Sequence, residues 1–277
     1  MRLRLRLKVH GMSLRDTFRF VWLREIAALT AMACAAVSLN SQPQRQTPPR
    51  PVLVELFTSE GCSDCPPADA LLARLDAVQP VLGAHVIVLS EHVTYWDQQG
   101  WRDPFSLQAV TDRQRDYGDR FKLDSIYTPQ AVVDGATQFV GSDPRAMVKA
   151  IQQEVPTPAV EIAIDGATAN GGAVQFQVHA GGATPNAILH DAVLIAVLAD
   201  DKAETRVLRG ENGGKTLQHV AVVRTLQTLR KDAFDGRTLT IKLPDSDKPG
   251  GALRLVVFAS DKRTGHVLGA AEQTLAR

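Results

Sequence analysis

Two cysteines separated by two residues, Cys62 and Cys65, constrain this sequence more than any other feature. They follow a near-continuous apolar run over residues 52–57, which predicts a buried strand. Pro66 and Pro67 come directly after the second cysteine, and because neither carries an N–H group they fit only the first turn of a helix. The motif therefore lies between a buried strand and a helix N-terminus, with Cys62 at or just before the helix cap.

This placement suits thiol chemistry, because a helix dipole favours the negative charge of a thiolate. We expect Cys62 to be the nucleophile and Cys65 the resolving thiol. Asp64 disfavours the Cys62 thiolate and stabilises the oxidised pair, which favours a reductant or a disulfide isomerase partner over a strong oxidant. Glu55, on the expected strand, is a candidate proton relay for Cys65; the alternative is a carboxylate that faces the surface from a strand end.

The N-terminal segment predicts export. Basic residues crowd the first two dozen positions and precede an apolar stretch at residues 26–39, the pattern of a signal peptide over residues 1–39. The stretch is shorter than the roughly 20 apolar residues that a membrane span needs. The alternatives are an uncleaved anchor, an amphipathic helix, or a lipid anchor at Cys34, and translation starts at Met1 or Met12. We expect a periplasmic or secreted protein that meets the membrane only through this leader.

Export changes how the cysteines are interpreted. Cleavage after Cys34 leaves Cys62 and Cys65 as the only thiols, and a bond between them closes a loop too short to stabilise the fold much. The formal net charge of +1 provides no strongly basic field, so we expect no nucleic-acid partner. No phosphate loop, dinucleotide fingerprint or HExxH motif is present, so we expect no cofactor. The composition leaves the dithiol as the main chemical feature.

The elements expected after the linker at residues 40–51 alternate between strands and helices. The strand at 52–57 is followed by a helix over 68–78, a strand over 85–89, a helix over 106–117, a hairpin of 131–133 with 138–140, and a last helix that Asp143 caps. Strands separated by helices imply parallel pairing, and the hairpin adds an antiparallel edge. This βαβαββα order over residues 52–155 predicts an α/β thioredoxin-like fold.

A second region follows the proline-rich break at residues 155–158. Gly-rich turns separate short apolar runs, and these runs predict strands over 159–164, 174–178, 192–198, 205–208, 219–223, 239–243, 253–259 and 266–270. Many short strands in this length of chain favour an all-β, sandwich-like C-terminal domain over residues 159–277.

Two segments resemble a known redox family. Residues 54–65 resemble the first strand and active-site loop of glutaredoxins, and residues 128–135 with 140–143 resemble their cis-proline segment and the turn after their hairpin. Over residues 50–275 the chain more closely resembles exported proteins of domain-of-unknown-function family 1223. That likeness rests on residues 57–69, 95–96, 101, 103–105, 209–212 and 222–224. The family is assigned a thioredoxin-like fold without an established activity.

The resemblance implies roles for several residues. Pro129 would be cis, with Thr128 pairing to the backbone of a substrate; the alternative is an ordinary trans proline. Ser142 and Asp143 would hold a small thiol such as glutathione, or serve only as a helix cap.

The loop over residues 90–104 departs from glutaredoxins and should flank the dithiol. Within it Tyr95 and Trp96, with Trp101, would form an apolar wall for a substrate, or would only anchor the loop to the body of the protein.

Three functions remain open at this point. The first is an exported thiol–disulfide oxidoreductase that acts on exported proteins or small thiols and needs a redox partner. The second is a copper(I) carrier in which His92 joins Cys62 and Cys65, since soft thiolates select that ion; we assign no metal ligands on this basis. The third is a non-catalytic binding module with an idle dithiol. The sequence does not determine the oligomeric state.

Overall fold

The computed structural model describes residues 48–170, 172–181, 189–229, 233–243 and 251–276. Residues Pro48–Arg277 belong to one compact unit. The expected signal peptide, Cys34 and most of the expected linker lie outside the described residues. No helix in the described part of the chain has the length and apolar character needed to cross a membrane.

The first half contains every element that the sequence predicts. In chain order they are β1 (Arg50–Thr58), α2 (Pro66–Val78), β2 (Ala84–His92), α3 (Gln108–Phe121), β3 (Gln130–Val133), β4 (Thr137–Val140) and α4 (Pro144–Glu154). Asp143 caps α4 as expected, because its Oδ1 accepts hydrogen bonds from the backbone N–H groups of Arg145 at 2.9 Å and Ala146 at 3.0 Å. The hairpin and the proline-started helices are thus confirmed.

The second half is built of strands. They are β5 (Glu161–Asn170), β6 (Ala173–Gly181), β7 (Ala192–Arg206), β8 (Thr216–Thr228), β9 (Leu239–Lys242), β10 (Leu253–Asp261) and β11 (Val267–Leu275), with a short 3-10 helix at Ala233–Asp235. Each lies at or near a run of apolar residues that predicts it. The predicted run at 192–198 and the first two residues of the run at 205–208 belong to one strand, β7, which ends at Arg206.

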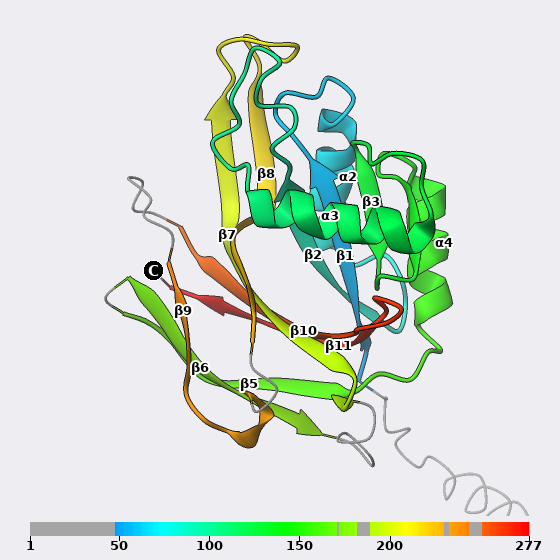
Figure 1. Ribbon diagram of the computed structural model, residues 1–277, viewed down its shortest axis with the longest axis vertical. Helices are drawn as coiled ribbons and strands as arrows, with labels where there is room; N and C mark the ends of the chain where they lie inside the picture. Colours follow the sequence, from blue (N-terminus) through cyan, green and yellow to red (C-terminus); the bar gives the residue numbers. More distant parts are fainter. Residues whose placement is uncertain (1–47, 171, 182–188, 230–232, 244–250, 277) are drawn as a thin grey trace, which may run out of the picture. The chain divides into compact units, whose positions relative to one another are not determined.

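The expected fold class is wrong. The strands of the two halves form one eight-stranded mixed sheet in the order β11-β10-β7-β8-β2-β1-β3-β4, beside a three-stranded sheet in the order β5-β6-β9 (Figure 1). The protein is mostly β, with three α-helices among the described residues. It is not a thioredoxin-like α/β domain followed by a separate β-sandwich. The halves join where β2 pairs in parallel with β8, at Ser90 and Val222.

Strand β7 shows why the sequence did not predict this joint sheet. Its residues alternate between two cores: Ile195 and Val197 pack with β1, β2 and the helices, whereas Leu194 and Ala196 pack toward the three-stranded sheet. Strand β10 alternates in the same way. Both faces of each strand are buried, so each appears in the sequence as a continuous apolar run. Such a run does not show which two layers the strand lies between.

Candidate functional site

Cys62 and Cys65 form a disulfide at the start of α2. The helix begins at Pro66, and Cys65, rather than Cys62, is its N-cap residue. Between the cysteines Ser63 and Asp64 are exposed. The cysteines themselves are not, with Cys62 at 1% and Cys65 at 0% exposure. The accessible nucleophile expected from the sequence is therefore covered in this oxidised form.

A loop from the second half of the chain covers the disulfide loop. The side-chain amide of the buried Asn212 donates to the backbone carbonyls of Glu60 at 2.9 Å and Cys62 at 2.8 Å. Glu211 accepts a hydrogen bond from the backbone N–H of Ser63 at 3.0 Å. Hydrogen bonding from the Ser63 side chain, together with this backbone bond, lowers the pKa of the Glu211 carboxyl. Lys215 donates to the Asn212 Oδ1 at 2.9 Å. The loop between β7 and β8 is thus fastened to both sides of Cys62.

The predicted aromatic residues are half-buried, and each is anchored by a polar atom. Trp96 Nε1 donates to Thr128 Oγ1 at 2.7 Å, Trp101 Nε1 donates to Glu60 Oε2 at 2.8 Å, and the Tyr95 hydroxyl donates to a glutamine of α3 at 3.2 Å. These bonds match the anchoring alternative. An apolar wall for a substrate remains a prediction.

The peptide bond between Thr128 and Pro129 is cis, as the resemblance implies. The Pro129 carbonyl accepts a hydrogen bond from the Gly141 N–H at 2.9 Å, and Gly141 lies against the first turn of α2. Directly after Gly141 in the chain, Ser142 is half-buried and Asp143 is exposed. The Asp143 carboxylate already caps α4, so a role in holding a small thiol remains a prediction for both residues.

Glu55 lies in a closed cluster under α3. Arg113 forms a bidentate ion pair with its carboxylate, and the Tyr117 hydroxyl donates to the same carboxylate at 2.6 Å. Burial alone would raise the pKa of Glu55, but Arg113 outweighs it and lowers that pKa. Burial and the neighbouring Glu55 raise the pKa of Glu91 well above its usual value. The Glu55 carboxylate is therefore buried and does not face the surface, and its role as a proton relay remains a prediction.

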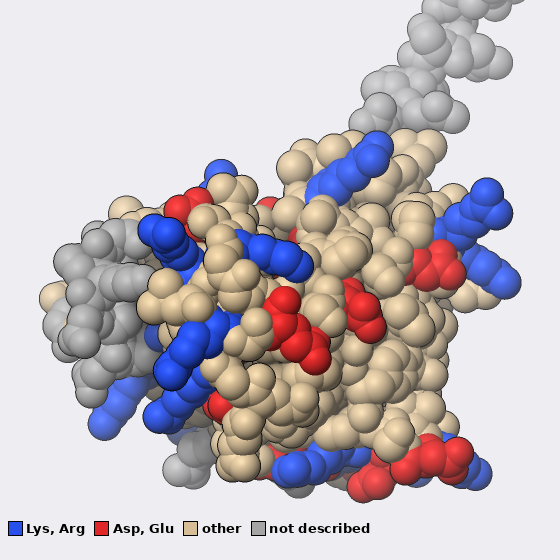
Figure 2. All heavy atoms as spheres, turned by 90° about the horizontal axis from the view of Figure 1, so that it is seen from above, with Lys and Arg blue, Asp and Glu red and all other residues tan. Residues whose placement is uncertain are grey.

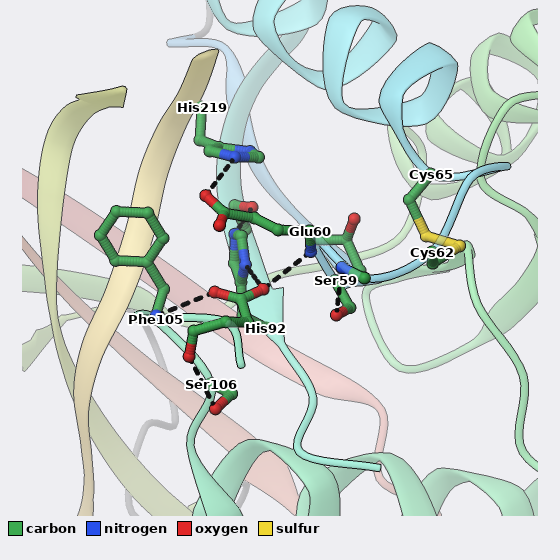
Figure 3. A network of polar contacts seen from close by, with 12 residues as sticks. Ser59, Glu60, Cys62, Cys65, His92, Phe105, Ser106 and His219 are labelled. Carbon is green, nitrogen blue, oxygen red and sulfur yellow. Dashed lines mark hydrogen bonds and ion pairs between the residues drawn. A yellow bond between two sulfur atoms is a disulfide. The ribbon is translucent and has the colours of Figure 1, made fainter. Parts of the chain in front are cut away.

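A second buried cluster lies beside the disulfide loop, as Figure 3 shows. His92 Nδ1 and the Asp103 carboxylate are 2.7 Å apart, and the same carboxylate accepts from the Glu60 N–H at 2.8 Å. His219 Nε2 is 3.4 Å from the Glu60 carboxylate, and the two histidine rings meet edge to face with centroids 4.8 Å apart. This cluster joins β2, β8 and the loop that leads to Cys62.

Burial and pairing act against each other in this cluster. Burial alone would lower the pKa of His92, but the Asp103 carboxylate raises it above the usual histidine value. Burial alone would raise the pKa of Asp103, but His92 lowers it. Both shifts favour the charged form of this buried pair.

The sequence did not single out Glu60, Asp69, Asp103, His219 or Asn212 as site residues. One signal was available for Asp69, which stands between the apolar residues Ala68 and Leu72 on the buried face of α2. Buried carboxylates are rare unless they are partnered.

Metal-binding geometry occurs elsewhere. Among the described residues, the one group of at least three candidate ligands lying close enough together consists of Asp134, Glu154 and His266. The Arg50 guanidinium already pairs with Asp134 at 2.5 Å and lies 3.7 Å from Glu154. A cation thus already occupies that position, and neither cysteine belongs to the group.

Comparisons with known proteins support the fold and leave the function open. The family model described as "protein of unknown function (DUF1223)" matches residues 53–260. A crystal structure of an Agrobacterium tumefaciens protein is 25% identical, with a TM-score of 0.57, covering 82% of this chain and 95% of that one. HBP35 of Porphyromonas gingivalis is 17% identical, with a TM-score of 0.57, covering 83% of this chain and 76% of that one. A comparison with curated proteins finds no match.

Proposed function

The chain belongs to the DUF1223 family, whose function is unknown, and from its site we propose that it is a thiol–disulfide oxidoreductase acting through Cys62 and Cys65. The observation that carries this proposal is the disulfide at the N-terminus of α2. Helix N-termini stabilise thiolates, which are the reacting form of cysteine. A bond spanning two intervening residues contributes little to stability, so a chemical role explains it better than a structural one.

The reaction would proceed by two exchanges. In the reduced protein the Cys62 thiolate attacks a substrate disulfide, forms a mixed disulfide and releases one substrate thiolate, which takes a proton from solvent. Cys65 then loses its proton and attacks the Cys62 sulfur, which releases the second substrate thiolate, and the protein is left with the Cys62–Cys65 bond. The protein loses two electrons and the substrate gains them. A separate reductant would regenerate the dithiol, and the reverse sequence would oxidise a substrate.

Substrates would have to reach buried sulfurs beside the loop of residues 207–215. Asn212 and Glu211 attach this loop to Cys62 and Ser63 by hydrogen bonds, which would have to break for the loop to move away. The end of the molecule that carries these loops is seen face-on in Figure 2, where charged groups of both signs stand among uncharged ones. Such a surface favours protein or small-thiol substrates over strongly charged ones.

Export remains part of this proposal. An oxidising compartment outside the cytoplasm would maintain the disulfide between turnovers. The copper(I) alternative has less support. The polar contacts of His92 go to Ser90 and Asp103, and no metal-ligand group in the described part of the chain combines His92 with a cysteine.

The test is an exchange assay with purified protein. Wild type should catalyse reduction of a model protein disulfide in the presence of a thiol reductant, and Cys62→Ser should abolish this catalysis. Cys65→Ser should instead trap a mixed disulfide, visible by mass spectrometry. Equal rates for wild type and both variants would refute the proposal.

A further inference from the structure

Asp69 lies one helical turn after Cys65. The backbone N–H of Asp69 donates to the Cys65 carbonyl at 3.1 Å, and residues four apart share a helix face. Its carboxyl group is buried, and one oxygen accepts a hydrogen bond from Thr58 at 2.9 Å. The buried resolving cysteine therefore has a buried carboxyl group in the next turn of its own helix.

His219 of β8 faces Asp69 of α2. Its Nδ1 lies 3.8 Å from the second Asp69 oxygen, and its Nε2 lies 3.4 Å from Glu60. The side chain is 1% exposed, yet neither ring nitrogen has a hydrogen-bond partner. Buried polar atoms in native proteins are nearly always hydrogen-bonded, so an unpartnered buried imidazole requires an explanation.

His219 is also one of the residues that line a cavity. A cavity of about 460 Å³ is lined by His219, by Ala73 of α2, and by Lys202 and Glu204 of β7. Lys202 and Glu204 are exposed, so the cavity opens to the surface. His219 thus neighbours the carboxyl group in the turn after Cys65 and also lines a cavity that opens to solvent.

We infer that Asp69 and His219 carry protons between the buried dithiol and the surface cavity. This inference rests on the proposed thiol–disulfide exchange, because only a reacting dithiol needs such a route. Both cysteines are buried, and a thiol that becomes a thiolate in a buried site must pass its proton to a nearby base. The Asp69 carboxylate is that base, and His219 connects it to water.

The proton balance of the second exchange is as follows. The Cys65 thiol gives its proton to the Asp69 carboxylate while its sulfur attacks the Cys62 sulfur of the mixed disulfide and expels the substrate thiolate. Asp69 then passes the proton to His219 Nδ1, and Nε2, which lies 3.4 Å from Glu60, releases a proton to water that enters from the cavity that His219 lines. The expelled thiolate takes a proton from solvent. Contacts of 3.4–3.8 Å shorten or take in one water during such transfers.

The groups around Asp69 suit this task. It faces Thr58 from β1, His92 from β2, His219 from β8 and Asp103 from the loop after β2. Burial raises the pKa of Asp69, and the two histidines offset part of that rise. A carboxyl group with a raised pKa takes up and releases protons more readily near neutral pH than an ordinary aspartate does.

The test separates the two exchanges kinetically. Reduced protein is mixed with an aromatic disulfide whose released thiol is coloured, and both release steps are followed across a range of pH. Asp69→Asn should slow the second step by about tenfold or more and leave the first unchanged. His219→Gln should slow the same step and shift its pH profile. The exposed residues Asp112 and His190 supply the controls, Asp112→Asn and His190→Gln, which should match wild type.

Superimposable profiles for wild type, Asp69→Asn and His219→Gln would overturn the inference. If Asp69→Asn does not fold, the His219→Gln profile decides alone. The proposed function is tested separately: catalysis that Cys62→Ser abolishes, together with unchanged relay variants, would retain the function and reject the relay. If wild type lacks catalysis, thiolate absorbance of the reduced protein still reports whether Asp69→Asn shifts the titration of Cys65, and an unshifted titration rejects the relay.

Discussion

Two buried polar clusters lie on opposite faces of β1 and β2, and they differ in how completely their charges are paired. On one face Glu55 makes a bidentate ion pair with Arg113 and a hydrogen bond with Tyr117. On the other face His219 lies within ion-pair distance of two carboxylates and makes no hydrogen bond. Alternation along β1 separates them, since Phe57 packs edge to face against Tyr117 of α3 and Thr58 donates a hydrogen bond to Asp69 of α2.

This difference distinguishes a structural cluster from a candidate functional one. A closed ion pair in the core gains nothing from exchanging protons, and removing one partner leaves an unpaired charge. A loosely bonded group that borders a cavity retains freedom to change its protonation. Glu91, next to the closed cluster, is the exception on the α3 face, because its carboxyl group has no cation bonded to it and its pKa is raised by burial and by the neighbouring Glu55.

The largest effect should come from opening the closed cluster. Arg113→Met leaves Glu55 buried without its counter-charge, which should cost about 3–5 kcal/mol of unfolding free energy. Urea unfolding measures this loss. The control is Arg115→Met on the same helix, because that arginine is exposed in its pair with Asp112 and should cost at most about 1 kcal/mol. Equal midpoints for the two variants would show that the closed cluster does not stabilise the fold.

Detaching the loop of residues 207–215 should lower stability and expose the disulfide. Asn212→Ala leaves the carbonyls of Glu60 and Cys62 unpaired and should cost about 2–3 kcal/mol. It should also speed reduction of the disulfide by dithiothreitol, because the loop no longer covers Cys62. The exposed Asn170 provides the control, Asn170→Ala. An unchanged reduction rate in Asn212→Ala would mean that this loop does not limit access.

The pH dependence of stability tests the unpaired carboxyl group. The folded protein holds the Glu91 proton more tightly than the unfolded chain does. This tighter proton binding stabilises the folded state. The stabilisation is complete below the ordinary glutamate pKa of about 4.3 and is lost as pH rises through the raised pKa of Glu91. Glu91→Gln mimics the protonated form, so its melting temperature should exceed that of wild type increasingly as pH rises. At alkaline pH the free energy of unfolding of Glu91→Gln should exceed that of wild type by about 1–2 kcal/mol. A gain independent of pH would contradict this account.

The smallest effect should come from Trp101, which joins the loop over residues 90–104 to Glu60 in the cluster beside the disulfide loop. Trp101→Phe removes the hydrogen bond to Glu60 and keeps an aromatic ring, which should cost about 1 kcal/mol. Trp96→Phe removes the bond to Thr128 and is the matched comparison. Thermal unfolding of both variants measures the difference. A much larger loss in Trp101→Phe would mean that Glu60 depends on this bond for its position.

Sequence patterns predicted local structure well where a local rule applied. Pro66 and Pro67 fixed the start of α2, Asp143 fixed the cap of α4, and the turn at Asp134 fixed the hairpin of β3 and β4. They did not predict that the second half extends the first sheet. Ala221 shows why, since it has a positive φ of 47° inside a strand that pairs with both β7 and β2, and nothing in its local sequence requires that conformation.

The sequence by itself determined the dithiol, the elements on either side of it, and the alternation of apolar residues that buries them. Those properties follow from spacing, proline geometry and hydrophobic periodicity, which act over a few residues. Only the tertiary structure decided the surroundings of the dithiol: Asn212 reaches Cys62 across 150 positions, and His219 meets Glu60 and Asp69 through the pairing of β8 with β2. Such contacts depend on which strands become neighbours, and that choice is made by packing of the whole chain.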